Sequence, residues 1–517
     1  MPTRVIEIVY VRGRRYLRLR ETRFEKPEPY AALSYCWGGT QCVTTTTESI
    51  YRHLIRINMQ DLQATIKDAV VVTERLGIMK LWVDAFCIIQ DDVVDKAWEI
   101  AQMPLVYSQA TVTIVASRAD RAEAGFLHDR KRIADGTPNK VFQLPYHCST
   151  SGQIGSVILV PPVQMPIEPL DLRAWALQER FLSTRIIDYG EIQTRWICQA
   201  YGSQKGPTDG FGNSAWWYGK WDKAMSDGLF LEAAQDLLPR KSFRRPEQNL
   251  RQRSLFQWYH LVRAYTDRSL TLGTDRLPAI SGIAAQFGEF IGDEYKAGLW
   301  ASDLGTELRW RNDLYPNQLQ PRPVGYQGPS WSWASVSVPV RLFPIGGEPD
   351  DFFEVLECET KIQAMSREFS VHDASFGAVE SGKLVLRGRL QPAEWIRAAD
   401  VAAHRQEFAF RKQGLQGSEG RLSGHMYPDA IEEEFTHEVT DCIPVFLLKV
   451  SNSEEIEGLV LRRSPQSEFS RLGIFGFHRP VIASNQYYTN EERRDWRRIR
   501  SDSEWLDDGP VQTITIV

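Results

Sequence analysis

Three short apolar runs alternate with two helical patterns between residues 30 and 117, and this alternation constrains the fold more than any other feature. The apolar runs are YAALSY (30–35), KLWVDAFCII (80–89) and TVTIVAS (111–117). Between the first two runs, Ile66, Ala69 and Thr73 fall on one helical face, and Gly77 ends the helix. A second helical pattern covers residues 95–110 and contains Pro104. Strand, helix, strand, helix and strand in this order predict a parallel α/β sheet.

The rest of the chain predicts a multidomain protein, because 517 residues are too many for one hydrophobic core. We expect an α/β domain over residues 1–204, which opens with a hairpin (4–11 and 15–21) and later has a helix over 171–185. A mainly helical region follows over 205–325. Residues 326–517 are rich in short apolar runs typical of strands, interrupted near 412–436 by a polar stretch that suits a loop or disorder.

Composition excludes several classes of function. The formal net charge is -5 and no basic block stands out, which argues against nucleic-acid binding. No run of 18 apolar residues is present, so we expect no membrane span, and no secretory signal is visible. Seven scattered cysteines without a CxxC pair favour reduced thiols and a cytoplasmic location. GxSxG, HExxH, Walker A and GxGxxG are all missing, and the histidines are too dispersed to indicate a metal site.

Three sequence blocks carry a family resemblance. They are YAALSYCWGG (30–39), the stretch from LWVDAFCIIQDD to TVTIVAS (81–117), and RAWALQERFLSTRII (173–187). In this order they resemble the heterokaryon incompatibility (HET) domain family of filamentous fungi over roughly residues 30–200. The resemblance implies a role in non-self recognition and programmed cell death, a form of fungal innate immunity. Ile89 is a departure, because the family commonly has Asn at this position.

A more distant similarity to Toll/interleukin-1 receptor (TIR) domains implies a flavodoxin-like fold and a chemistry. NAD-cleaving TIR domains carry a catalytic Glu four residues after a Trp, and Trp175 and Glu179 have this spacing. The long segment between Ser117 and Trp175 departs from the TIR pattern. The similarity implies that Glu179 is the catalytic carboxylate of an NAD hydrolase, with NAD as substrate and no further cofactor. The implied substrate contacts are Ser34, Tyr35, Trp37, Gly38, Asp84, Arg173 and Trp175.

These residue types suit the reaction. Cleavage of the nicotinamide–ribose bond builds positive charge on the ribose, which a nearby carboxylate such as Glu179 stabilises. Trp37 suits stacking on a cationic ring, and Gly38 would let backbone N–H groups approach the pyrophosphate. Arg173, Arg180 and Arg185 are candidates for pairing with phosphate.

Each candidate also has a structural alternative, which the sequence leaves open. Trp37 and Trp175 suit core positions, and Gly38 suits an ordinary turn. Asp84 suits a helix N-cap, and Glu179 suits an ion pair with Arg180. Three further residues are expected to be structural: Glu99 as a solvated helix residue, and Cys36 and Cys87 as buried apolar groups.

The preferred hypothesis is therefore a fungal HET-domain protein that hydrolyses NAD and responds to a protein recognition partner. We expect its activity to be controlled by self-association or by the appended region covering the site. The alternative is a non-enzymatic adaptor that assembles and recruits partners, in which Glu179 is structural. A third hypothesis is a sensor that binds a nucleotide without cleaving it. An enzyme needs Glu179 to share a cleft with residues 34–39, whereas an adaptor does not.

Overall fold

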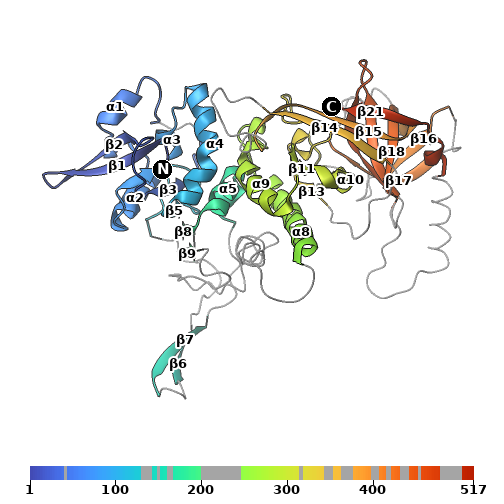
Figure 1. The fold of residues 1–517 in the computed structure, drawn as a ribbon. Coiled ribbons are helices and arrows are strands. Elements are labelled where there is room, and N and C mark those ends of the chain that lie inside the picture. Colours follow the sequence, from blue (N-terminus) through green and yellow to red (C-terminus); the bar gives the residue numbers. More distant parts are fainter. Residues whose placement is uncertain are drawn as a thin grey trace. The chain divides into compact units, whose positions relative to one another are not determined.

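The structure, a computed structural model, forms two compact units, Met1–Pro246 and Glu247–Val517. Figure 1 labels the helices and strands of both units. The described residues are 1–39, 43–129, 142–147, 152–159, 167–191, 193–198, 246–313, 318–342, 353–362, 376–396, 407–414, 421–430, 442–451, 456–477 and 504–517. The beginning of the predicted helical region, 205–245, lies outside these residues.

A seven-stranded mixed sheet forms the centre of the first unit, in the order β2-β1-β4-β3-β5-β8-β9. Its strands are β1 (Arg4–Val11), β2 (Arg14–Glu21), β3 (Ala31–Ser34), β4 (Lys80–Trp82), β5 (Val112–Val115), β8 (Arg185–Tyr189) and β9 (Thr194–Cys198). The four middle strands run parallel, whereas β1, β2 and β9 pair antiparallel at the edges. The predicted parallel α/β core and opening hairpin are therefore confirmed.

The helices of this unit are α1 (Ile50–Ile55), α2 (Ala64–Arg75), α3 (Asp84–Cys87), α4 (Val93–Gln109) and α5 (Ala174–Leu182), with short 3-10 turns η1 (Met59–Asp61) and η2 (Pro169–Leu172). The helices predicted after the first and second strands and over 171–185 are present, but the strand predicted over 80–89 ends at Trp82 and is followed by helix α3. An apolar run of this length does not distinguish a buried strand from a buried helical turn. Helix α4 begins where Asp92 accepts hydrogen bonds from the amides of Val94 and Asp95, and it continues through Pro104. Helix α2 packs on β3 and β4, and α4 packs on α5.

A separate hairpin, β6 (Phe142–His147) and β7 (Ile154–Leu159), lies in a stretch whose sequence shows no clear periodicity. Residues around it, 130–141, 148–151 and 160–166, are outside the described part of the chain.

The order of the parallel strands positions the candidate site. Strand β3 comes first in the chain but lies between β4 and β5. The chain therefore leaves β3 and β5 in opposite directions across the sheet. In open α/β sheets, ligands bind beyond the carboxyl ends of the strands at such a switch point.

The second unit begins with helices and short strands. These are α8 (Pro246–Thr266), η5 (Gly273–Asp275), α9 (Pro278–Ile291), β10 (Tyr295–Lys296), β11 (Leu299–Trp300), η6 (Ala301–Asp303), α10 (Leu304–Glu307), β12 (Arg311–Asn312), η8 (Trp333–Ser335) and β13 (Val340–Arg341). Its core is aromatic. Trp258 and Trp300 contact edge to face at 5.7 Å, and Trp331 and Trp333 are buried as well.

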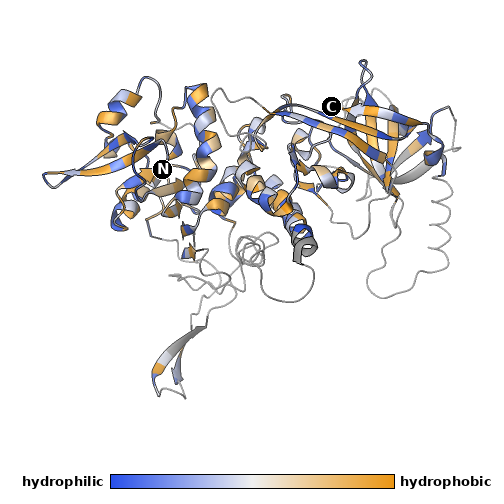
Figure 2. Cartoon of the chain, in the orientation of Figure 1, coloured by the Kyte–Doolittle hydropathy of each residue, from blue (hydrophilic) through white to orange (hydrophobic). Residues whose placement is uncertain are grey.

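The remaining described strands form one eight-stranded, mostly antiparallel sheet in which six strands close into a barrel, and this confirms the predicted β-rich region. They are β14 (Phe353–Ile362), β15 (Val379–Ile396), β16 (Glu407–Lys412), β17 (Arg421–Pro428), β18 (Cys442–Ser451), β19 (Ile456–Arg463), β20 (Phe469–Phe477) and β21 (Val511–Ile516), preceded by η9 (Glu504–Asp508). Strands β15, β16, β17, β20, β19 and β18 pair in a ring, because β18 also pairs with β15. Figure 2 shows polar and apolar residues alternating along the barrel strands, as a half-buried sheet requires.

The prediction of a loop near residues 412–436 is wrong for part of this stretch. Strand β17 lies within it, pairs with β16 and β20, and points Met426 into the barrel core. The polar sequence gave a weak local strand signal, and pairing on both sides stabilises the strand instead. Residues 415–420 and 431–436 lie outside the described part.

Candidate functional site

The carboxyl ends of the parallel strands carry most of the candidate residues. Ser34 is the last residue of β3 and Tyr35 to Gly39 follow it, whereas Asp84 begins α3 two residues after β4. Helix α5 supplies Trp175 and Glu179. Because parallel strands end at the same edge of a sheet, these segments converge although they are far apart in the sequence.

Glu179 lies at the centre of this group. The Ser34 hydroxyl donates a hydrogen bond to its Oε2, and the Glu179 side chain is only 8% exposed. Burial raises the pKa of Glu179 to about 7, although the Ser34 hydrogen bond and the charge of Arg173 act in the opposite direction. Glu179 can therefore gain or lose a proton near neutral pH.

Tyr107 of α4 also belongs to this group, and sequence reasoning missed it. Its buried hydroxyl donates to the carbonyl oxygen of Leu33 at 3.0 Å. Burial, together with the nearby charge of Glu179, raises the pKa of Tyr107 far above its ordinary value. Its apolar neighbours in α4 make it look like a core residue, so no local signal could have identified it.

A second carboxylate, that of Asp84, lies close to Glu179. The indole Nε1 of Trp37 donates to Asp84 Oδ2 at 2.8 Å, and the amide of Ala85 donates to Oδ1 at 2.7 Å. Asp84 is the first residue of helix α3, and Val83 occupies the N-cap position of that helix. The alternative that Asp84 is a helix N-cap is therefore wrong. Burial raises the pKa of Asp84, and the hydrogen bond from Trp37 opposes this rise.

Arg173 provides the positive charge between the two carboxylates. Its guanidinium donates to the carbonyl oxygen of Tyr35 at 2.5 Å and lowers the pKa of both Asp84 and Glu179. Burial raises the pKa of Tyr35 well above its ordinary value, and the nearby carboxylate of Asp84 raises it further. The structure thus joins three candidate pairs by hydrogen bonds: Ser34 with Glu179, Trp37 with Asp84, and Arg173 with Tyr35.

The remaining two candidates are Trp175 and Gly38. Trp175 is half-buried, one helical turn before Glu179. Gly38 has a φ of +73°, and a Cβ atom at this position would come within 2.0 Å of the Cβ of Arg121. Glycine is therefore required here because two chain segments approach closely, which favours the structural alternative for Gly38 over a phosphate cradle.

The arginines expected to meet phosphate have other positions. Arg180 pairs with Asp188 at 3.2 Å and with Asp171 at 3.5 Å, and it also bonds to Ser117. Glu179 does not need Arg180 as its partner, since Ser34 fills that role. Arg185 is the first residue of β8 and lies at the opposite end of the parallel strands, so its predicted place in the site is wrong.

Asp188 completes this second polar cluster. It is fully buried and accepts hydrogen bonds from Ser117, Arg180 and Arg195. Burial alone would raise its pKa, but the two arginines lower it below the ordinary value. A carboxylate that is charged and fully bonded suits a structural role rather than a reactive one.

Comparison with known sequence families decides the identity of this segment. Residues 30–179 match the family described as "Heterokaryon incompatibility protein (HET)". This segment is a HET domain. Its range begins just before β3 and ends at Glu179, so it contains Glu179 and all seven predicted substrate contacts but not Arg180 or Arg185. No curated protein matches the chain, and no solved structure matches it either. The HET domain indicates involvement in heterokaryon incompatibility.

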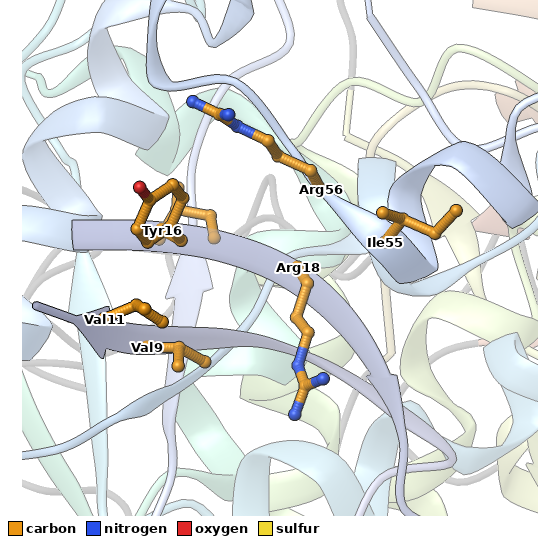
Figure 3. Close-up of a pocket in the computed structure, with 7 residues that line it drawn as sticks. Val9, Val11, Tyr16, Arg18, Ile55 and Arg56 are labelled. Carbon is orange, nitrogen blue, oxygen red and sulfur yellow. The ribbon is translucent and has the colours of Figure 1, made fainter. Parts of the chain in front are cut away.

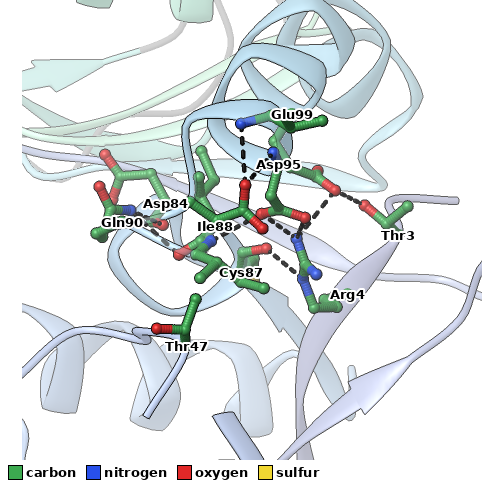
Figure 4. Close-up of polar contacts among 12 residues, drawn as sticks. Thr3, Arg4, Thr47, Asp84, Cys87, Ile88, Gln90, Asp95 and Glu99 are labelled. Atoms are coloured by element: carbon green, nitrogen blue, oxygen red, sulfur yellow. Dashed lines mark hydrogen bonds and ion pairs between the residues drawn. The ribbon is translucent and has the colours of Figure 1, made fainter. Parts of the chain in front are cut away.

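Another polar cluster holds the end of α3, the short helix that begins with Asp84, and the loop that follows it (Figure 4). The Arg4 guanidinium donates to the carbonyl oxygen of Cys87 at 2.8 Å, and it pairs with Asp95 and Glu99. Asp95 in turn accepts a hydrogen bond from the amide of Ile89 at 2.9 Å. The backbone at Ile89 is therefore held by Asp95, and its side chain is buried.

The expectation of a solvated Glu99 is wrong. Its side chain is 1% exposed and accepts hydrogen bonds from Thr3 and Arg4 (Figure 4). Burial raises the pKa of Glu99 to about 7 despite these bonds. A glutamate within an amphipathic helix gives no local sign that the amino terminus of the chain will cover it.

The two cysteines of the HET domain that lie in the described part of the chain, Cys36 and Cys87, behave as buried apolar groups. Both are free thiols. Burial raises the pKa of Cys36 to about 11 and that of Cys87 to about 12, so both stay protonated near neutral pH. The described residues include no group of His, Cys, Asp and Glu side chains suited to a metal ion, and no described helix is long and apolar enough to cross a membrane.

Proposed function

We propose that the HET domain cleaves the nicotinamide–ribose bond of NAD, with Glu179 as the catalytic carboxylate. The observation that carries the proposal is the environment of Glu179. A buried carboxylate with a pKa of about 7 lies beside Ser34 and Arg173, at the carboxyl end of a parallel sheet. This combination is typical of reactive groups rather than of surface carboxylates.

The order of the parallel strands supports the fold that this proposal assumes. Numbered along the chain, the strands β4-β3-β5-β8 have the order 2-1-3-4. This is the order found in flavodoxin-like sheets, which bind ligands at the switch point beside the first strand. Ser34 ends that first strand.

The reaction that we propose needs one carboxylate. The bond between ribose C1′ and the nicotinamide nitrogen breaks, and its electron pair stays on nicotinamide, which leaves as a neutral molecule. The ionised Glu179 stabilises the positive charge that develops on the ribose. Water then adds to C1′ and transfers a proton to Glu179, which gives ADP-ribose.

Neighbouring residues would bind and orient the substrate. Trp37 is half-buried and its indole is fixed by Asp84, so we propose that its ring stacks on nicotinamide. Arg173 would balance the two carboxylates, and Ser34 would orient Glu179. Because Glu179 is only 8% exposed, the reaction requires the side chains around it to move apart when substrate enters.

The test is nicotinamide release from NAD by the full chain over a series of protein concentrations. Glu179→Gln keeps an acceptor for the Ser34 hydroxyl and removes the charge. Glu168→Gln is the matched control, because Glu168 is also buried with a pKa raised to about 7 but lies outside the bonded group. We expect wild type and Glu168→Gln to release nicotinamide, with a rate that rises as the pH passes about 7, and Glu179→Gln to be inactive. Equal activity of wild type and Glu179→Gln would contradict the assignment.

The low exposure of Glu179 favours a second candidate, a non-enzymatic adaptor that assembles with other copies or partners. In that case Glu179 is a structural group that joins α5 to β3. The adaptor predicts no nicotinamide release at any protein concentration and unchanged self-association in Glu179→Gln. The hydrolase predicts release that steepens with concentration if assembly is its switch.

A further inference from the structure

A shallow hollow of about 260 Å³ lies beside the hairpin at the edge of the sheet in the first unit (Figure 3). Its lining is mostly apolar and includes Val9, Val11, Tyr16 and Ile55. Val9 and Tyr16 are cross-strand partners, so they lie on one face of the β1–β2 hairpin. The hollow combines this face with the end of α1.

Large apolar side chains around this hollow are exposed. Val11 is 51% exposed, and Ile55 is 81% exposed. Tyr51 lies one helical turn before Ile55 and is exposed as well. A contiguous apolar hollow with exposed side chains is a typical feature of an interaction site.

Positively charged side chains flank the hollow: Arg56 lines it, and Arg14 is the cross-strand partner of Val11, which also lines it. Arg14 and Arg56 are exposed, as is Arg52, and no ion pair is formed by these three within the described residues. The guanidinium of Arg56 lies 5.0 Å from the ring of Tyr16, and Figure 3 shows Tyr16 between Arg56 and the two valines. Residues 1–56 contain ten basic and five acidic side chains, in a chain whose formal net charge is -5. The excess of positive charge is thus local.

We propose that this hollow docks an acidic peptide segment of a partner protein. One large apolar side chain of the peptide enters the space beside Val9, Val11 and Ile55, and flanking carboxylates pair with Arg14 and Arg56. Charge complementarity selects the acidic occupant, because these arginines have no carboxylate partner among the described residues. The concave shape favours a peptide side chain over a membrane, which is bound by apolar groups that project outward. The surface is separate from the Glu179 group and does not depend on NAD cleavage.

The proposed docking can be tested by selecting peptides that bind the full chain from a display library of short random peptides. Arg14→Glu combined with Arg56→Glu serves as the counter-target, and Arg387→Glu is the matched control, since Arg387 is exposed on β15 in the second unit. We expect selected peptides to carry an aromatic or aliphatic residue between Asp or Glu residues. Their affinity, measured by fluorescence anisotropy, should fall at least about tenfold with the double reversal and with added salt, and should not change in Arg387→Glu.

Ile55→Ser tests the apolar part separately, because so exposed a residue contributes little to folding. This variant should bind the selected peptides more weakly and lose the preference for a large central side chain over Ala. Selected peptides without acidic residues, or equal binding by wild type and the double reversal, would overturn the proposal. Binding of anionic phospholipid vesicles or RNA through the same arginines, with no acidic peptide selected, would overturn it too.

Discussion

At the scale of single residues, the pKa of Glu179 is set by burial, which raises it, and by polar neighbours, which lower it. Ser34 and Arg173 favour the charged carboxylate, but burial favours the protonated one and prevails. The pKa is raised from 4.5 to about 7. A raised pKa also means that Glu179 links the stability of the protein to pH.

Between these two pKa values the folded protein holds a proton that the unfolded chain has released. The stabilisation from this proton is therefore fully present below about pH 4.5 and is lost as the pH rises through about 7. Gln carries no charge at any pH. We expect Glu179→Gln to be more stable than wild type at about pH 8, by on the order of 1–3 kcal/mol, and similar to it at low pH. Thermal unfolding of both proteins at several pH values measures this difference in stability. A difference that stays the same at every pH would refute the prediction.

At the scale of elements, a charged cluster fastens β1 to α4 and to the start of α3. Arg4 comes from β1, Asp95 and Glu99 come from α4, and the Cys87 carbonyl ends α3. The loop after α3 is bonded on its other side as well, since the amide of Gln90 donates to the carbonyl oxygen of Thr45 at 2.8 Å. Asp84 therefore keeps its position through elements that are distant in the sequence.

Removing the arginine should leave the buried carboxylate of Glu99 and the half-buried carboxylate of Asp95 without their partner. We expect Arg4→Ala to lower the free energy of unfolding of the first unit by roughly 3 kcal/mol and to speed hydrogen exchange in residues 84–91. Arg15→Ala is the control, because its ion pair with Glu74 is partly exposed and should contribute less than about 1 kcal/mol. Equal hydrogen exchange in the two variants would show that the cluster does not support this loop.

At the scale of the whole molecule, each unit is closed by contacts between distant segments. In the second unit Arg471 of β20 is fully buried, and its guanidinium stacks 3.6 Å from the ring of Trp310. It pairs with Asp429 at 3.1 Å and donates to the carbonyl oxygens of Leu308 and Trp310. One side chain thereby connects the barrel to the segment between α10 and β12.

Lysine keeps the charge of Arg471 but lacks the planar group that stacks and donates several hydrogen bonds. We expect Arg471→Lys to destabilise the second unit by roughly 2–4 kcal/mol, because Asp429 stays buried with a poorer partner. Thermal unfolding followed by hydrogen exchange in residues 456–477 reports on this unit specifically, because tryptophans occur in both units. Arg387→Lys, an exposed change, should leave the midpoint almost unaltered, and equal midpoints for both variants would contradict the role of Arg471.

The sequence by itself determined the local elements and their order. Alternating strands and helices predicted the parallel core, since burial on one helical face or on both sides of a strand leaves a periodic pattern in neighbouring residues. The same order also placed Ser34 and Asp84 at one edge of the sheet. These inferences succeed because they depend on residues that are close in the chain.

Only the tertiary structure decided which distant groups meet. It gave Glu179 a hydrogen bond from Ser34 and buried Glu99 beside Arg4. It placed Arg185 at the start of β8, at the opposite end of the parallel strands from the site. It required glycine at position 38, because Arg121 approaches the backbone there. It also made a strand of the polar segment β17 by pairing it on both sides. Each outcome depends on packing between segments far apart in the sequence, and such packing leaves no periodic signal in either segment.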